Sequence, residues 1–224
     1  QELKALPEQF DHEPFEKLGY KLFFMPAQKK GYSGVAIFSK IVPKHVEYGC
    51  GNELYDFEGR VIRADYEDFS VMSVYMPSGT SGDIRQDFKY EWLDFFQSYV
   101  ETLRKELPGL VISGDYNIAH EAIDIHNPVS NKKSSGFLPE ERDWLTSVFD
   151  ELGFVDVFRE INPEPDQYTW WSNRGQAWAN NVGWRIDYHI ATPNIADTAT
   201  KAEIYKNERF SDHSPLTIHY DHNL

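Results

Sequence analysis

The sequence predicts an α/β fold, in which short strands alternate with longer amphipathic helices. Three observations support this prediction: short apolar runs typical of strands, two segments with helical apolar spacing, and no internal repeat or low-complexity linker within the 224 residues. Interleaved strands and helices are typical of an α/β or α+β domain. The spacing is too irregular for a simple βαβ repeat. The pattern is compatible with two sheets and outer helices, without requiring that arrangement.

The expected strands are short apolar runs rich in β-branched residues. They are Val35–Phe38, Val71–Met76, Leu110–Ser113, Ile186–Ala191 and Leu216–Tyr220. Within the fourth run, apolar residues alternate with Asp187 and His189, which is the period of a half-buried strand.

Two segments between these strands have helical periodicity. Apolar side chains from Phe88 to Leu107 recur at intervals of three or four residues, and Pro108-Gly109 ends the run. A second helix is expected from Pro139, with acidic residues in its first turn, and Gly153 ends it. We expect one domain over residues 1–224.

The composition restricts the class of protein. Thirty-six acidic against 22 basic residues give a net charge of −14, whereas proteins that bind polyanions usually carry a basic surface. The acidic excess indicates either solubility alone or carboxylates that hold a divalent cation. The single cysteine, Cys50, excludes a disulfide framework and a multi-cysteine zinc site. With a mean hydropathy of −0.57 and no bilayer-length apolar run, we expect a cytoplasmic protein without a membrane partner.

Several catalytic motifs are excluded by spacing. Gly49-Cys50-Gly51 lacks the third glycine of a dinucleotide-binding turn, and His126 lies too far from His120-Glu121 for a metalloprotease helix. Ser211-Asp212-His213 holds triad residue types, but adjacent residues do not face one another in a triad.

Polar residues at the ends of the expected strands remain as candidates. Asp115 and Asn117 follow an apolar run and project to the same side of an extended chain, although an ordinary turn explains them equally well. Asp187 lies within an alternating strand, where a buried acid needs a partner such as histidine. Asp212 and His213 precede the last strand. Carboxylates and an imidazole without clustered cysteines favour hydrolysis assisted by Mg²⁺ or Mn²⁺.

Short motifs follow one another through nearly the whole chain. They are Gln1–Lys4, Gly31–Ala36 with Ser39-Lys40, Val74–Pro77, Gly114–His120, Ile123–Pro128, Gly136-Phe137 with Glu141-Arg142, Tyr168–Trp171, Gly183–Tyr188 and Ser211–His213. Their order resembles the exonuclease III / apurinic-apyrimidinic (AP) endonuclease family, within the endonuclease–exonuclease–phosphatase superfamily. The later motifs distinguish its DNA-repair branch from lipid and inositol phosphatases. The resemblance implies a four-layer α/β sandwich, with two central mixed sheets flanked by helices.

The resemblance also implies an activity. A Mg²⁺-dependent (or Mn²⁺-dependent) nuclease of this family hydrolyses the phosphodiester 5′ of abasic sites in double-stranded DNA, together with 3′–5′ exodeoxyribonuclease and 3′-phosphatase activity. We expect a monomer in a bacterial-type cytoplasm, associated with the nucleoid. Two alternatives remain: a phosphatase or lipid phosphodiesterase on the same scaffold, and a catalytically impaired DNA-binding fragment. The latter is considered because the family pattern has a further strand before Gln1–Lys4, so we expect an N-terminally incomplete domain.

Family membership would assign roles to the candidate catalytic residues. Asp115 would orient or deprotonate the attacking water, and Asn117 would donate to the phosphate. Asp187 would fix the tautomer of His213, whose imidazolium would stabilise the charged phosphorus centre. Tyr75 would donate to the phosphate or to the leaving oxygen.

The same resemblance implies metal ligands and DNA contacts. Glu2 and Asp212 would hold or position the cation and its water. The loop residues Asn131, Lys132 and Lys133 would meet the phosphate backbone, and Trp170, Trp184 and Ile186 would receive the flipped-out abasic sugar. Each has a plainer alternative, namely a solvated basic loop for the first set and core packing for the second. Arg85 and Lys89 are weaker candidates for DNA contact.

Overall fold

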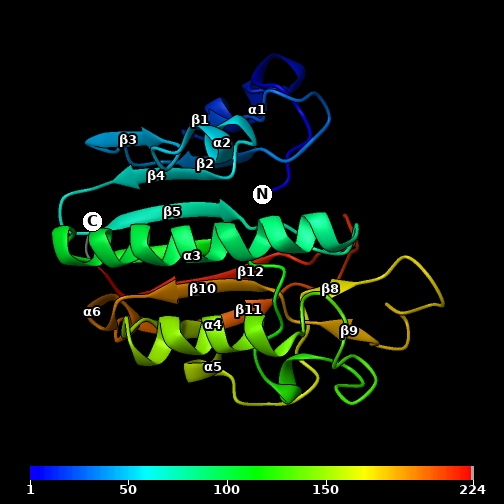
Figure 1. Ribbon diagram of the computed structural model, residues 1–224. Helices are drawn as coiled ribbons and strands as arrows, with labels where there is room; N and C mark the ends of the chain where they lie inside the picture. The colour runs from blue at the N-terminus through cyan, green and yellow to red at the C-terminus, as the bar shows by residue number, and fades with distance from the viewer. Residues whose placement is uncertain (223–224) are drawn as a thin grey trace.

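The structure is a computed structural model that describes residues 1–222, and its main element is a six-stranded mixed sheet (Figure 1). The strand order is β3-β4-β5-β6-β10-β7, with bounds β3 His45–Tyr48, β4 Val61–Asp65, β5 Ser70–Tyr75, β6 Leu110–Asp115, β10 Asp187–Ala191 and β7 Val155–Asp156. β5 and β6 are parallel, and the other neighbours are antiparallel. This register decides which polar strand ends meet.

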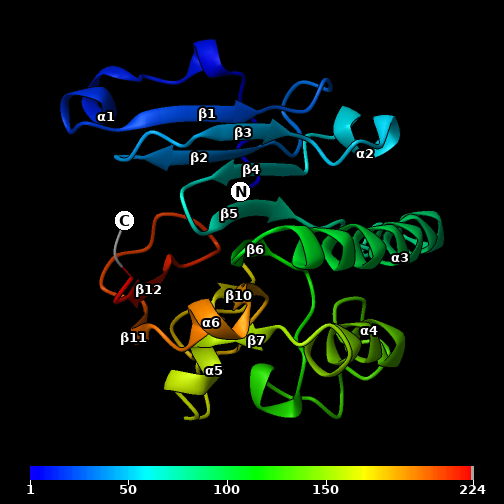
Figure 2. The same ribbon diagram turned by 90° about the vertical axis from the view of Figure 1, so that its left-hand side faces the viewer.

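Three two-stranded antiparallel ladders accompany the main sheet. They are β1 (Lys21–Met25) with β2 (Val35–Ser39), β8 (Trp170–Trp171) with β9 (Gly183–Trp184), and β11 (Ala199–Ile204) with β12 (Leu216–Tyr220). The β1–β2 and β11–β12 ladders lie beside different parts of the main sheet (Figure 2). The α/β sandwich is therefore confirmed, but the expected second central sheet is not continuous within residues 1–222. The β1–β2 and β11–β12 ladders each share a different apolar cluster with the main sheet.

The helices vary in length. Their bounds are α1 Glu13–Lys17, α2 Glu53–Phe57, α3 Asp83–Glu106, α4 Pro139–Asp150, α5 Val157–Ile161 and α6 Pro193–Ala196, with short 3₁₀ helices at Pro7–Gln9 and Ala122–Asp124. The two long helices, α3 and α4, cover one face of the main sheet and bury its largest apolar cluster, which includes Trp92 and Trp144. Across residues 1–222, no helix combines the length and apolar character needed to cross a bilayer.

Each strand and helix expected from the sequence is present; the strand Leu216–Tyr220 has the expected bounds, and the others have shifted ends. The helix expected from Phe88 begins earlier, at Asp83, directly after Gly82, whose φ of 109° is a conformation that suits glycine. The strand expected from Ile186 begins at Asp187. Two residues, Arg185 and Ile186, separate the end of β9 at Trp184 from the start of β10 at Asp187.

Candidate active site

The register of the main sheet brings three candidate side chains to one edge. Tyr75 ends β5, Asp115 ends β6 and Asp187 begins β10. Asp115 is the register partner of Tyr75 on one side and of Asp187 on the other. Because residues in register present their side chains to the same face, the three groups lie in one row across neighbouring strands.

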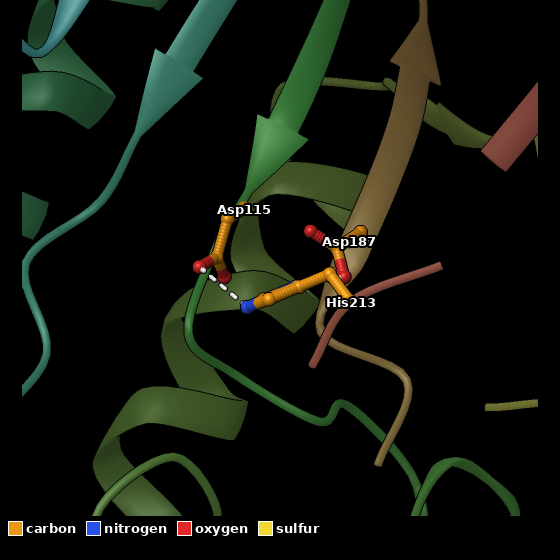
Figure 3. A group of neighbouring side chains, drawn as sticks. All are labelled: Asp115, Asp187 and His213. Atoms are coloured by element: carbon orange, nitrogen blue, oxygen red, sulfur yellow. Dashed lines mark hydrogen bonds and ion pairs between the residues drawn. The ribbon is translucent and has the colours of Figure 1, made fainter. Parts of the chain in front are cut away.

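His213 reaches this row from the segment before β12. Its backbone forms an isolated bridge with Trp170. The imidazole Nδ1 lies 2.9 Å from Oδ2 of Asp187, and Nε2 lies 3.8 Å from Oδ2 of Asp115. Figure 3 shows the ring between the two carboxylates. Three residues that are far apart in the sequence therefore form one compact cluster.

The cluster has strongly shifted proton affinities. Burial, followed by the charge of Asp187, raises the pKa of Asp115 to about 7, against the opposing effect of His213. Burial alone would lower the pKa of His213, but Asp187 and then Asp115 outweigh it and raise the pKa to about 10. The imidazole is therefore held in its charged form near neutral pH, between two acidic groups that repel one another.

The donor set fits a divalent cation. Ligand atoms of Asp115, Asp187 and His213 all lie within 4.8 Å of one another. Carboxylate oxygens are the donors that hard cations prefer, and a cation would relieve the repulsion that raises the pKa of Asp115. The carboxylate oxygens of this cluster can therefore contribute to a metal site, whereas the charged imidazole offers no lone pair to a metal.

Glu2 and Asp212 lie beside this cluster. Both line a cavity of about 400 Å³, together with Asp115, Asp187 and His213. One oxygen of Glu2 is 2.9 Å from Nζ of Lys4, and Oδ2 of Asp212 accepts a hydrogen bond of 3.1 Å from Nε1 of Trp170. These contacts leave further lone pairs on each carboxylate.

Tyr75 and Asn117 are fixed near Asp115 by different interactions. Burial, and then Glu2 and Asp115, raise the pKa of Tyr75, so its phenol remains a hydrogen-bond donor at neutral pH. Asn117 has a left-handed φ of 51°. Its N–H donates to Oδ1 of Asp115 (2.8 Å), while Nδ2 donates to the carbonyl of Met76 (2.9 Å) and lies 3.3 Å from Oδ2 of Asp115. The Asn117 turn therefore orients the Asp115 carboxylate.

A second cavity, of about 820 Å³, adjoins the first. Trp170, Trp184 and Ile186 line one side of it, and Asp115 and His213 also reach it. The two indoles meet edge to face with ring centroids 6.2 Å apart. Ile186 is buried, whereas both tryptophans are half-buried and keep a surface toward the cavity. The three predicted pocket residues thus form one apolar wall beside the acidic cluster.

The predicted basic loop reaches this cavity only in part. Lys133 lines it, whereas Asn131 and Lys132 do not. Asn131 shapes its own loop, since its amide donates to the carbonyls of His126 (3.3 Å) and Asn127 (3.0 Å) and its oxygen accepts from Ser134. Both lysine side chains are exposed.

The sequence reasoning missed an ion pair that supports the site. Lys89 is wholly buried, so the hypothesis that it contacts DNA is wrong. Its Nζ donates to Glu141 (2.5 Å) and to the carbonyl of Asn117 (2.8 Å). Oε2 of Glu141 accepts from the N–H groups of Gly136 (2.6 Å) and Leu138 (3.0 Å). Glu141 was visible as an acid in a helical first turn and as part of the Glu141-Arg142 motif, but nothing local pairs it with a lysine 52 residues away.

Arg85 is also engaged within the protein. Its guanidinium lies 3.2 Å from Glu58 and donates to the hydroxyl of Tyr32 at 3.0 Å. These contacts account for the charge of Arg85 without a bound partner.

A layered α/β fold with an imidazole between two carboxylates at one sheet edge defines a metal-assisted hydrolase. Residues 1–213 match the endonuclease/exonuclease/phosphatase family, and the chain belongs to this family. The relatives described next also confirm the exonuclease III / AP endonuclease branch that the motifs resemble.

Named relatives cover most of this chain. An exodeoxyribonuclease of Bacillus subtilis (strain 168) is 40% identical over 219 residues, which are 97% of this chain and 85% of the relative. The DNA repair nuclease APEX1 of Danio rerio is 39% identical over 216 residues, covering 96% of this chain and 68% of that protein. Recombination repair protein 1 of Drosophila melanogaster is 40% identical over 222 residues, and the chain spans 32% of its length.

Solved structures show the same fold. An AP endonuclease from Archaeoglobus fulgidus superposes with a TM-score of 0.89 at 32% identity, covering 98% of this chain and 86% of that one. The 3′ phosphatase NExo from Neisseria, bound to a product DNA hairpin, superposes with a TM-score of 0.90 at 28% identity and the same coverage.

Proposed function

We propose that the chain is a DNA-repair nuclease that uses Mg²⁺ to hydrolyse the phosphodiester 5′ of abasic sites. The same centre would serve 3′–5′ exodeoxyribonuclease and 3′-phosphatase reactions, because water attacks a phosphorus atom in each of the three reactions. The observation that carries the proposal is the position of His213 between Asp115 and Asp187, beside an apolar cavity. Relatives named as exodeoxyribonuclease and DNA repair nuclease support it.

Asp115 is the group best suited to position and deprotonate water. Its pKa of about 7 keeps a proton acceptor available near neutral pH, where general bases are most effective. Asn117 restricts the rotation of that carboxylate. In this proposal the 3.3 Å contact from Nδ2 of Asn117 gives way to the phosphate oxygen.

His213 supplies positive charge to the reacting phosphate. Asp187 binds Nδ1 at 2.9 Å, so Nε2 is directed toward the Asp115 side of the cavity. An imidazolium at this place stabilises the negative charge that develops on phosphate oxygens in the transition state. The protonated phenol of Tyr75 would donate to the phosphate or to the leaving oxygen.

Glu2 and Asp212, beside the Asp115–Asp187 pair, would hold Mg²⁺ or Mn²⁺. Their hard oxygen donors suit either ion. When bound, the ion neutralises phosphate charge beside a protein whose net charge is −14.

The substrate class follows from the second cavity. An apolar wall of Trp170, Trp184 and Ile186 suits the apolar face of a deoxyribose that has lost its base. Lys133 at the cavity, with Asn131 and Lys132 in the same loop, would face phosphates of double-stranded DNA with abasic or 3′-blocked sites. Few cations are available for phosphate contacts, so the affinity for DNA should be modest and should decrease as salt is added. The Bacillus subtilis relative supports a bacterial-type setting. Within that setting, we propose that the chain acts in the cytoplasm near the nucleoid, as a monomer.

The test is incision of a labelled duplex that contains one abasic site, with Mg²⁺ and with a chelator. We expect a cut on the 5′ side of the site in Mg²⁺, and none after chelation or on the matched intact duplex. Inositol phosphates and a phosphodiester lipid, assayed in parallel, test the competing phosphatase and lipid phosphodiesterase functions. Phosphate release from those substrates without incision of DNA would overturn the proposal.

A further inference from the structure

Thr169 joins three chain segments that carry site residues. It is fully buried and directly precedes Trp170. Its N–H donates to the carbonyl of Trp184 at 2.9 Å, and its own carbonyl accepts the N–H of Ser214 at 2.8 Å. The Thr169 backbone therefore connects the apolar cavity wall to the segment that carries His213.

The hydroxyl of Thr169 accepts two further hydrogen bonds. Its Oγ1 lies 3.1 Å from the backbone nitrogen of Ile186 and 3.1 Å from that of Asp187. Consecutive N–H groups of an extended strand point in opposite directions, so two of them reach one oxygen only where the chain bends. This is the bend between the end of β9 and the start of β10.

The sheet supplies no substitute acceptor at this place. Within residues 1–222, β7 pairs with β10 only at Ile190 and Ala191. On the other side of the bend, the carbonyl of Ile186 accepts the N–H of Tyr116 at 2.8 Å. A buried N–H group without a partner is costly, so the bend depends on the Thr169 oxygen.

We propose that the Thr169 hydroxyl is a positioning group, which holds the backbone of Asp187 so that its carboxylate meets Nδ1 of His213. The same oxygen holds Ile186 in the cavity wall. One buried hydroxyl thereby couples the substrate pocket to the catalytic cluster. The catalytic consequence of this coupling rests on the proposed nuclease function.

The decisive comparison is Thr169→Val against Thr169→Ser. Valine keeps the shape of threonine and removes the oxygen, whereas serine keeps the oxygen and removes the methyl group. Loss of a group that orients a catalytic residue typically costs about 10- to 100-fold in activity. We therefore expect Thr169→Val to lower kcat for abasic-site incision by about that factor, with duplex Kd within about threefold. Thr169→Ser should keep kcat within about threefold of the parent.

Two kinetic outcomes would overturn the proposal. Equal losses in the valine and serine variants would show that the methyl group matters, through packing. An unchanged kcat in a folded Thr169→Val variant would show that the hydroxyl does not position Asp187. If the valine variant does not fold, Thr169→Ala replaces it, because alanine and serine differ only by the oxygen.

A readout independent of turnover separates this proposal from the nuclease function. Amide hydrogen exchange at Ile186 and Asp187 should accelerate in Thr169→Val and not in Thr169→Ser, and the His213 ring signals in NMR spectra should move only in the former. If the parent protein does not incise abasic DNA, the proposed function fails while these measurements still test the positioning. Unchanged exchange and ring signals in Thr169→Val would refute it.

Discussion

Two buried carboxylates, Asp115 and Asp124, occupy contrasting electrostatic environments. Asp115 is 4% exposed and Asp124 is 1% exposed, so both have lost their water. Oδ1 of Asp124 lies 2.7 Å from Nε of Arg185 and 2.6 Å from Nη2 of Arg159. Burial would raise the pKa of Asp124, but these two guanidinium groups outweigh it and hold the pKa below its usual range. Burial and a second carboxylate instead raise the pKa of Asp115 to about 7.

The difference in pKa reflects two roles: Asp124 supports the structure, and Asp115 belongs to the proposed reaction centre. Asp124 neutralises Arg185, which lies in the chain between the cavity residues Trp184 and Ile186 and also binds Asp156 at 2.6 Å. That network is charge-balanced and holds the cavity wall in place. The Asp115 cluster retains unfavourable negative charge, which a bound cation can offset. Equal burial therefore does not imply an equal role.

The largest effect is expected from Asp115→Asn. Removing the proposed general base should lower incision by about 10⁴-fold, the upper range for acid–base catalysis, while duplex Kd changes little. Single-turnover incision and a binding titration measure the two quantities. Asp143→Asn, an exposed position on α4, is the matched control. Retained turnover in Asp115→Asn would contradict the catalytic role proposed for Asp115.

His213→Ala should have the next largest effect. Loss of the charged donor should cost about 3–5 kcal/mol of transition-state stabilisation, as for other strong donors to a developing oxyanion. The ratio of kcat/KM values on the abasic duplex measures it. A loss below about tenfold would contradict the role assigned to this imidazole.

Asp124→Asn should act on stability instead of chemistry. Removing one partner of a buried ion pair typically costs about 3–5 kcal/mol, because the remaining charges stay buried. Both Arg159 and Arg185 would lose their shared carboxylate. Urea unfolding measures the change, and Asp115→Asn is the internal comparison, since it relieves repulsion and should not destabilise. Equal destabilisation by both substitutions would contradict the proposed difference between Asp115 and Asp124.

Trp184→Ala should weaken discrimination more than binding. Removal of one indole from the cavity wall should reduce the preference for abasic over intact duplex by about tenfold, in line with about 1–3 kcal/mol for altered pocket packing. Incision rates on the matched duplexes, with Kd for each, separate the two effects. Parallel losses of preference and affinity would assign Trp184 to core packing alone.

A pH dependence of stability is also expected in the presence of chelator. The pKa of Asp115 is raised to about 7, so the folded protein binds a proton that the unfolded chain releases near pH 3.9. This group therefore costs increasing stability as pH rises from about 4 to about 7, and Asp115→Asn should gain Tm relative to the parent over that window. Asp124 has the opposite sign, since its stabilising contribution is lost only below pH 3.9. A Tm difference that is flat from pH 4 to 7 would contradict the assigned shift of Asp115.

Sequence reasoning reached most of the site through residue chemistry and motif order. Asp187 was expected to need a histidine partner, and His213 provides one at 2.9 Å. Lys89 shows where such reasoning fails, because helical spacing does not distinguish an exposed lysine from one buried against Glu141. Thr169 was visible only as part of Tyr168–Trp171, since a hydroxyl that accepts from residues 17 and 18 positions later has no local signal.

The amino-acid sequence by itself determined the chemical groups, their order, and the periodicity that forms the long helices and the main strands. These are local properties of the chain. Only the tertiary structure decided that Tyr75, Asp115 and Asp187 share one row, because strand register depends on pairing between distant segments. It also decided that Asp115 faces a carboxylate while Asp124 faces two arginines, since the charge felt by a buried acid depends on neighbours brought together by folding.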